Sequence, residues 1–371
     1  MHFVALILAV SLPIASSFRL PTLSSLFTPL KQSPLGYEPY QSYVGDLPLP
    51  CREIHQFDFP FYIQSIYVAS NGDLLVTTIA PTASVWHLSE VTTGTPKVTK
   101  VVELDYISLI AAITGTQDPD VFLFVGGNQT TIGAGVNGTH SVFELNLRKG
   151  VDRPVVTRRV HMADASFCVH IEPIPGRDGK YLVSDTKAGI IWRVDVESGT
   201  YEEIMHDNSM IPPAWAPIAF GINSAHVHDG YVYYSNAYLG YFYRFRMTDD
   251  GYAAPGAKIE IYQHMRAVFV DGVTFGPGTG DVIWVASNAN NQLVAVPPWG
   301  DPVAVLGASD ETVLAGPVAV AFGKLPGDTE TLYVVTGGAL LNPVNGSFVE
   351  GGRVLAVDTT GFAFSLGGNE L

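Results

Sequence analysis

Cysteine is scarce in this sequence: Cys51 and Cys168 are the only two among 371 residues. A dense disulfide framework is therefore excluded, and at most one intramolecular bridge can form. A Cys51–Cys168 bridge would close a long loop and add roughly 4 kcal/mol to stability in the chain-entropy model. Two free buried thiols are the alternative, and both states stay open at this point.

Positive charge is also in short supply, with 20 Lys and Arg against 35 Asp and Glu and a net charge of −15. Nucleic acid and anionic membrane surfaces are therefore not expected as partners, because like charges repel. Charged residues make up only 15% of the chain and hydrophobic residues 47%, so it can bury one large core and is not disordered. The composition carries no prediction of oligomeric state.

Apolar runs long enough to cross a bilayer are absent, since a membrane-spanning helix needs about twenty residues. The apolar stretch 3–14 is followed by Ala15-Ser16-Ser17, a small-residue pattern typical of signal peptidase sites. We therefore predict a signal peptide at 1–17, a Pro/Ser-rich leader at 18–50 and one domain at 51–371. We expect a secreted or secretory-pathway protein, glycosylated at one or more of the sequons Asn128, Asn137 and Asn345.

Several catalytic fingerprints are missing as well. No Gly-x-Ser-x-Gly elbow occurs, and no glycine-rich motif opens a helix as in Rossmann or phosphate-loop proteins, so a nucleotide cofactor is not expected. His226 and His228 have the spacing that places two imidazoles on one face of a strand, where they could hold zinc. No third ligand is evident nearby, so polar residues near a turn are the preferred interpretation.

What the chain does contain is one repeated pattern, which starts near Cys51: a strand, a turn with Gly, Asp or Asn, a second strand, a polar loop and a third strand. Six such units predict an all-β, six-bladed β-propeller, because each small sheet can bury its faces only against its neighbours. A two-sheet sandwich would not predict this regular repeat. We expect residues 51–57 to close the ring. The third strands are predicted at Val85–Leu88, Val142–Leu145, Ile191–Val194, Tyr243–Arg246, Leu293–Val296 and Val354–Val357.

The innermost strands of a propeller line a central channel, and their leading ends open on one face where a ligand can bind. That face is where we expect the site. The leading ends are predicted at Tyr62–Ser65, Gly126–Asn128, Phe167–His170, Phe220–Ser224, Val270–Gly272 and Gly316–Val318.

The stretches 221–224, 229–237, 270–273, 316–317, 321–323 and 332–338 resemble the fungal branch of the SMP-30/gluconolactonase propellers, over roughly residues 52–360. In that family a Glu, an Asn and an Asp hold a divalent metal, usually calcium, which supports lactone or ester hydrolysis. The resemblance places the Asn at Asn223 and the Asp at Asp271, but Gln64 stands at the Glu position. A hard cation is held largely by carboxylate charge, so we expect no metal cofactor; if calcium binds, Asn223 and Asp271 are its ligands.

The predicted channel mouth is instead rich in aromatic residues, which suits a hydrophobic small-molecule substrate better than a sugar lactone. In length, signal peptide and altered axial site the chain is similar to the secreted hetero-Diels–Alderases of fungal tropolone-sesquiterpenoid pathways. That resemblance implies a pericyclase that couples an ortho-quinone methide to a humulene-type olefin. The alternatives are a calcium-dependent lactonase or esterase and a non-catalytic binding propeller.

The roles that we assign to the candidate site residues follow from what a cycloaddition requires. The enzyme must hold the two reactants in one relative orientation and polarise the electron-poor reactant. His170 or Asp271 could also assist loss of water from a hydroxymethyl precursor, although a structural role for Asp271 in capping backbone N–H groups is equally expected. The predicted hydrogen-bond donors to the quinone methide carbonyl are Tyr62, Gln64, His170 and Asn223. The predicted walls of the substrate slot are Phe61, Phe167, Trp215, Phe220 and Phe269.

Overall fold

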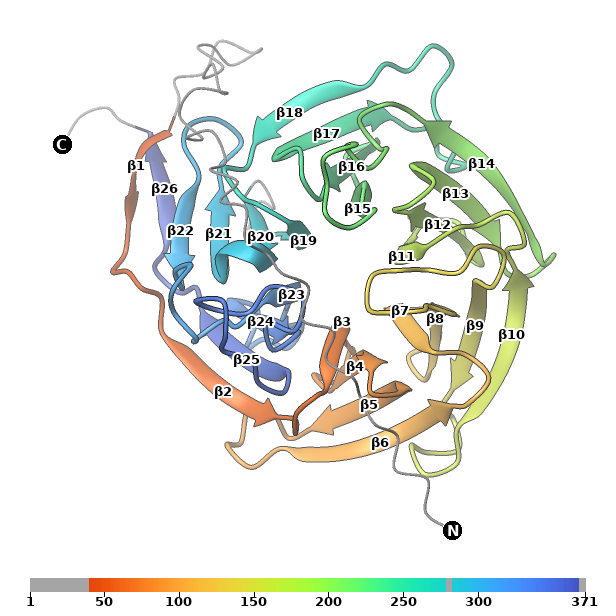
Figure 1. The fold of residues 1–371 in the computed structure, drawn as a ribbon, viewed down its shortest axis with the longest axis horizontal. Coiled ribbons are helices and arrows are strands. Elements are labelled where there is room, and N and C mark those ends of the chain that lie inside the picture. The colour runs from red at the N-terminus through yellow and green to blue at the C-terminus, as the bar shows by residue number, and fades with distance from the viewer. Residues whose placement is uncertain (1–39, 278–281, 367–371) are drawn as a thin grey trace. The chain divides into compact units, whose positions relative to one another are not determined.

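The computed structural model describes residues 40–277 and 282–366, whose regular secondary structure is almost entirely β-strand (Figure 1). The predicted signal peptide, 1–17, and residues 18–39 of the predicted leader lie outside this described part. Within it, the helical structure is the short 3-10 helix η2 (Asn288–Asn290), and no helix has the length and apolar character needed to cross a membrane.

Six four-stranded antiparallel sheets form the blades of a β-propeller, as the sequence predicts (Figure 1). From the innermost strand outward, blade 1 contains β3 (Tyr62–Val68), β4 (Leu74–Ala80), β5 (Ala83–Ser89) and β6 (Lys97–Leu104). Blade 2 contains β7 (Leu109–Gly115), β8 (Val121–Gly127), β9 (Ser141–Asn146) and β10 (Val155–His161). Blade 3 contains β11 (Cys168–Pro173), β12 (Lys180–Asp185), β13 (Ile190–Asp195) and β14 (Thr200–His206).

The second half of the ring repeats this order. Blade 4 contains β15 (Ile222–His228), β16 (Tyr231–Asn236), β17 (Tyr241–Arg246) and β18 (Glu260–His264). Blade 5 contains β19 (Val270–Phe275), β20 (Ile283–Ser287), β21 (Gln292–Val296) and β22 (Val303–Leu306). Blade 6 contains β23 (Pro317–Phe322), β24 (Thr331–Thr336), β25 (Arg353–Asp358) and, from the beginning of the described chain, β2 (Cys51–Gln56).

The ring is closed by β2, which pairs antiparallel with β25 and so joins the two ends of the propeller. This confirms the predicted closure by residues 51–57. Ile54 and Phe57 pack into the core between blades 6 and 1, so closure buries apolar area as well as completing the sheet. Outside the blades, β1 (Tyr40–Val44) pairs with β26 (Ala363–Leu366) in a two-stranded sheet.

The hydrophobic core consists of layers between neighbouring blades. Leu75 and Val85 of blade 1 pack with Ile113 and Phe122 of blade 2, and equivalent clusters lie at the other five junctions. Central strands are therefore buried on both faces, as β8 is along its whole length. Outermost strands such as β10 are mostly exposed, which explains their more polar sequences.

Blade 2 differs from the sequence prediction. Gly126–Asn128 was predicted to open its innermost strand, but that strand is β7, and Gly126 and Gly127 end β8. The antiparallel pairing of Leu109 with Gly127 explains the error, because the end of β8 and the start of β7 lie at the same face. The mostly apolar sequence of β7 carries no alternation that would mark it as a strand lining a channel.

The possible Cys51–Cys168 disulfide is not formed, and both cysteines are free. Cys51 lies in the outermost strand of blade 6, whereas Cys168 begins the innermost strand of blade 3, halfway around the ring. A disulfide requires Cα atoms within about 7 Å, which this placement prevents.

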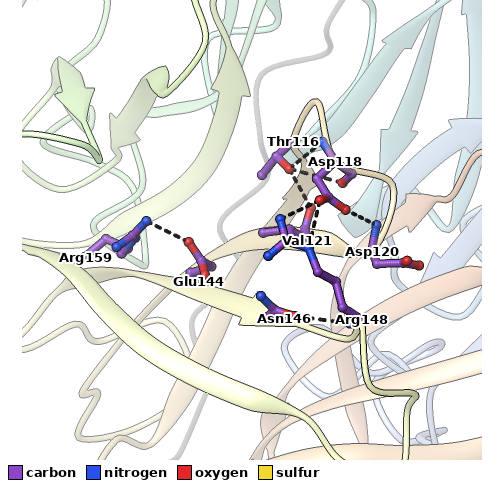
Figure 2. Close-up of polar contacts among 8 residues, drawn as sticks. All are labelled: Thr116, Asp118, Asp120, Val121, Glu144, Asn146, Arg148 and Arg159. Atoms are coloured by element: carbon purple, nitrogen blue, oxygen red, sulfur yellow. Dashed lines mark hydrogen bonds and ion pairs between the residues drawn. The ribbon is translucent and has the colours of Figure 1, made fainter.

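Polar contacts hold the turn between the end of β7 and the start of β8 (Figure 2). This turn lies at the opposite end of blade 2 from the start of its innermost strand, β7. Asp118 accepts hydrogen bonds from the backbone N–H of Asp120 at 2.9 Å and from Arg148 Nε at 2.8 Å. Glu144 Oε2 and Arg159 Nη2, 3.0 Å apart, link β9 to β10 in the same way. These largely exposed contacts shape the hairpins and contribute little to stability, because solvent screens them.

Candidate active site

A pocket lies at the face where the innermost strands begin, which is the face predicted for a ligand. Blades 1 to 5 and the loops that follow β8 and β24 form its walls. Most of its surface is apolar, and the polar side chains in it are those of Tyr62, Gln64 and Asp271. The lining residues are Tyr62, Gln64, Ile79, Leu109, Ala111, Ile132, Gly133, Phe167, Val169, Phe220, Phe269, Asp271 and Leu341.

The pocket is small. Its cavity volume of about 10 Å³ leaves room for roughly one water molecule. Ile132 and Leu341, from the loops after β8 and β24, pack against the apolar cluster that surrounds it. Pockets for organic ligands commonly measure about 300–1,000 Å³, so this cavity is far smaller than an organic ligand requires.

Asp271 is the acidic residue of the pocket, and its carboxylate is held by two amides. Its Oδ1 accepts a hydrogen bond from Asn223 Nδ2 at 3.0 Å, and its Oδ2 accepts one from Asn288 Nδ2 at 3.3 Å. All three side chains are buried. Asn288 is not identified by the sequence analysis; the available signal is its position directly after the buried strand β20.

Burial decides the protonation behaviour of the polar residues. It raises the pKa of the Asp271 carboxyl to about 7, because the hydrogen bonds from Asn223 and Asn288 offset only part of the cost of burying a charge. Burial, followed by the charge of Asp271, also raises the pKa of Tyr62 well above its ordinary value. Tyr62 is therefore a neutral phenol that can donate a hydrogen bond, whereas Asp271 can exchange a proton near neutral pH.

Gly337 fixes the position of the Tyr62 ring. A Cβ at position 337 would lie 2.4 Å from Tyr62 Cε2, a distance that no side chain tolerates. The loop that carries Leu341 therefore begins with the one residue that allows its backbone to approach the phenol this closely.

Three phenylalanines form the wall opposite blades 1 and 2. The Phe220 ring lies between those of Phe167 and Phe269, with edge-to-face centroid distances of 5.5 and 5.3 Å. Each precedes an innermost strand, so the three rings come from blades 3, 4 and 5. Phe269 has a φ of +50°, which is rare for a bulky residue and strained. The surrounding contacts thus hold Phe269 in a conformation that aims its ring into the pocket.

The structure brings most of the predicted site residues together. Tyr62, Gln64, Asp271 and the three wall phenylalanines line the pocket, while Asn223 supports Asp271. Two predicted aromatic residues are not part of the lining. Phe61 packs against Phe57 and Trp86, and Trp215 is 63% exposed and contacts Tyr238 edge to face.

His170 also lies outside the pocket lining, one residue beyond Val169 along β11. Its Nε2 is 3.8 Å from Glu172 Oε2, and its ring contacts His226 of β15 edge to face. Burial favours a neutral Glu172, but the neighbouring His226 and His170 outweigh it and hold the pKa of this carboxyl at about 2. The imidazole predicted to face the substrate therefore belongs to a separate cluster, whose acidic member the sequence analysis did not identify.

The axial residues do not fit the calcium site of the SMP-30/gluconolactonase family. Calcium takes six to eight oxygen ligands and depends on carboxylate charge. Here Asp271 is the single acidic residue in the pocket lining, Gln64 stands at the family's Glu position, and both Asp271 oxygens accept amide N–H groups. As placed, both amides direct their nitrogens, and not their oxygens, at the carboxylate.

We expect Gln64→Glu to raise the affinity for Ca²⁺ by about tenfold or more, because it restores a second carboxylate beside Asp271. Isothermal titration of both proteins with CaCl₂ measures the change. Gln117→Glu, at an exposed position, adds the same charge away from the pocket and should leave the affinity unaltered. Stoichiometric, tightly bound calcium in the unmodified protein would contradict the expectation.

No family model matches the chain. A protein of Sarocladium schorii, provisionally named hetero-Diels-Alderase asR5, is 28% identical to it over 346 residues and is aligned over 85% of both chains. A Phoma protein provisionally named hetero-Diels-Alderase is 27% identical over 352 residues, covering 88% of this chain and 96% of its own.

Solved structures share the fold at lower identity. A luciferin-regenerating enzyme has a TM-score of 0.61 at 14% identity, covering 86% of this chain and 98% of its own. Regucalcin, a calcium-binding protein from Agrobacterium tumefaciens, has a TM-score of 0.55 at 14% identity, covering 84% and 94%. These likenesses concern the fold alone. The chain is thus a six-bladed β-propeller that shares its fold with regucalcin, and it is a homologue of two proteins named hetero-Diels-Alderases.

Proposed function

We propose that this protein is a hetero-Diels–Alderase that couples an ortho-quinone methide of the tropolone type to a humulene-type sesquiterpene olefin. The names of its homologues support a pericyclase role. The observation that carries the proposal is the composition of the pocket: an aromatic wall faces a neutral phenol, Tyr62, and a carboxyl, Asp271, whose pKa is about 7. Such a pocket suits two largely apolar partners of which one carries a carbonyl.

In this mechanism Tyr62 and Gln64 donate hydrogen bonds to the carbonyl oxygen of the quinone methide. The oxygen gains negative charge as the reaction proceeds, so donors that are already in place stabilise the transition state. One carbon–carbon bond forms between the methide carbon and the olefin, and one carbon–oxygen bond forms between the carbonyl oxygen and the other olefin carbon. No redox partner or nucleophile is needed, because all the electrons come from the two reactants.

Asp271 has a separate task, the formation of the quinone methide from a hydroxymethyl precursor. Its protonated carboxyl gives a proton to the departing hydroxyl group, which leaves as water. The ring hydroxyl of the precursor then loses its proton, which returns to Asp271. A pKa near the working pH suits a group that must both give and take a proton.

The apolar wall has the task of positioning. Phe167, Phe220 and Phe269 present ring edges and faces that hold the polyene against the quinone methide in one orientation, which lowers the entropic barrier and selects a diastereomer. Because the cavity is small, the proposal requires that binding of both partners displaces Ile132 and Leu341. Product release then depends on the same loops.

The test is to supply a quinone methide precursor with humulene and to compare the rate and diastereomer ratio with those of the spontaneous reaction. We expect a faster reaction with a different ratio, independent of added Ca²⁺. Equal rate and ratio with and without protein would reject the proposal. Calcium-dependent hydrolysis of simple lactones would favour a lactonase, and saturable binding without turnover would favour a binding propeller.

We expect Tyr62→Phe to lower turnover by about ten- to a hundredfold, because it removes one hydrogen-bond donor to the developing oxyanion and keeps the ring. The matched control is Tyr333→Phe, since Tyr333 is equally buried and its hydroxyl donates to Asp328 Oδ2 at 3.0 Å, away from the pocket. Single-turnover rates at saturating substrate measure the difference. Equal losses in the two variants would point to a general loss of stability instead.

A further inference from the structure

His170, Glu172 and His226 form a second polar cluster, outside the pocket lining. His170 and Glu172 lie on β11 and His226 on β15, the innermost strands of blades 3 and 4. Glu172 Oε2 is 3.8 Å from His170 Nε2 and 3.5 Å from His226 Nδ1. One candidate ligand atom from each of the three residues lies within 4.8 Å of the other two.

These separations are close to those around a bound transition metal. Zinc binds imidazole nitrogen and carboxylate oxygen at about 2.0–2.2 Å, which places neighbouring ligand atoms of a tetrahedral site about 3.3 Å apart. The observed distances to Glu172 exceed this value by a few tenths of an ångström. Small rotations of the His170 and His226 rings would therefore close the cluster around one ion.

His170 has a nitrogen atom that the protein leaves unpaired: its Nε2, which faces Glu172, is buried and makes no hydrogen bond in the described part of the chain. His226 faces Glu172 with Nδ1, and its other nitrogen, Nε2, is likewise buried and unpaired there. A buried polar atom without a partner is destabilising. The backbone of Ala225 also interacts with the His170 ring, and backbone groups commonly orient metal-binding histidines in this way.

We propose that His170, Glu172 and His226 bind a divalent transition-metal ion of the zinc class and thereby link blades 3 and 4. Two imidazoles and one carboxylate form the donor set found in His₂Glu zinc sites, and nitrogen donors disfavour calcium. The three side chains are 17–21% exposed, so the cluster borders solvent, and rotation of the rings would let an ion reach the covered nitrogen atoms. The site is independent of the proposed cycloaddition, which needs no metal.

The arrangement also revises the interpretation of His226 and His228. These residues have the spacing of a zinc-binding pair, but His228 stacks on Phe275 with a centroid distance of 4.7 Å, and its Nε2 lies 3.5 Å from Asp229 Oδ2. His228 is not one of the three clustered residues. The missing ligands come from the neighbouring blade, where sequence spacing cannot reveal them.

The test uses the full chain without a histidine tag, stripped of metal and titrated with Co²⁺ and Zn²⁺. We expect close to one equivalent of either ion, a visible Co²⁺ absorption band that Zn²⁺ abolishes and Ca²⁺ does not, and a higher melting temperature with Zn²⁺, since an ion bound only to the native state stabilises it. Failure of wild-type protein to give the band or the stoichiometry would overturn the proposal.

Variants locate the ion. Glu172→Gln and His226→Ala should weaken binding by about a hundredfold or more, because each removes a direct ligand. His228→Ala, on the same strand, should bind as the wild type does. Circular dichroism of the metal-free proteins checks folding, and Glu172→Gln keeps the side-chain shape. Equal weakening by His228→Ala, or loss of binding on Asp271→Asn, would place the ion elsewhere and reject this site.

Discussion

Asp271→Asn is expected to lower turnover from a hydroxymethyl precursor by about a hundred- to a thousandfold, the range usual for loss of a general acid–base group. The amide cannot donate a proton to the departing hydroxyl and recover it. A preformed quinone methide should react with the variant almost as fast as with the wild type, because Tyr62 and Gln64 remain. Comparing the two substrates therefore separates dehydration from cycloaddition.

The same substitution should raise stability at alkaline pH. Because the pKa of Asp271 is raised by burial from 3.8 to about 7, its stabilising contribution is fully present below about pH 4 and is lost as the pH rises through 7. Above that pH the wild type must keep a poorly solvated charge buried, at a cost of up to about 4 kcal/mol. The amide that replaces the carboxyl carries no charge, so the variant should melt at a higher temperature than the wild type at pH 8 and show little advantage at pH 4.

The measurements are a pH–rate profile and melting curves at several pH values. The wild-type rate from the precursor should fall above about pH 7, where Asp271 loses its proton, and this limb should disappear in the variant. Asp328→Asn is the control: Asp328 is a buried acceptor for the Leu325 backbone N–H and for Tyr333, away from the pocket. An unchanged profile and rate in Asp271→Asn would leave Asp271 with a structural role alone.

The blade architecture could be predicted because each blade repeats the same local chemistry. The third strands, such as Ile191–Val194, recur at regular intervals, and this recurrence indicates a ring. The innermost strand of blade 2 was missed because Leu109–Gly115 is buried between two blades and shows no apolar–polar alternation. Periodicity identifies a strand best where one face meets solvent.

The site was predictable where position along a blade determines position in space. Phe167, Phe220 and Phe269 each precede an innermost strand. In a ring of blades, all innermost strands begin at the same face, so the three side chains lie close together there. Trp215 also precedes an innermost strand, β15, but it lies in a loop that places it at the surface, where it is 63% exposed. An aromatic residue in a loop gives no indication of which way the loop turns.

Contacts between blades could not be predicted in the same way. Within blade 5, Asn288 of η2 meets Asp271 of β19. Between blades 3 and 4, Glu172 meets His226 only because β11 and β15 are neighbours around the axis. Such pairs depend on the rotation between blades and on the bulges in β11 and β15. Neither the rotation nor a bulge can be identified from the spacing of residues along the sequence. The resemblance to the SMP-30/gluconolactonase family supplied Asn223 and Asp271 because the family pattern already encodes that geometry.

The second large effect is expected at the aromatic wall, from Phe220→Ala. Phe220 is the central ring of the three and is 5% exposed, so its removal should destabilise the protein by about 3–5 kcal/mol and leave a cavity between Phe167 and Phe269. That cavity would join the pocket and give the polyene more than one orientation. The diastereomer ratio should therefore move toward that of the spontaneous reaction, while kcat/KM falls by about ten- to a hundredfold.

The control must separate stability from positioning, and blade 2 offers a close match. Phe124 is fully buried, stacks on Phe143 with a centroid distance of 5.1 Å and does not line the pocket. Phe124→Ala should lower the unfolding free energy by a similar amount and leave the diastereomer ratio of the folded enzyme unchanged. Denaturant unfolding and chiral product analysis, both performed well below the melting temperature, give the two quantities. If both variants alter the ratio equally, or if neither does, Phe220 does not set the orientation of the olefin, because a residue that positions substrate must affect selectivity beyond its effect on the folded population.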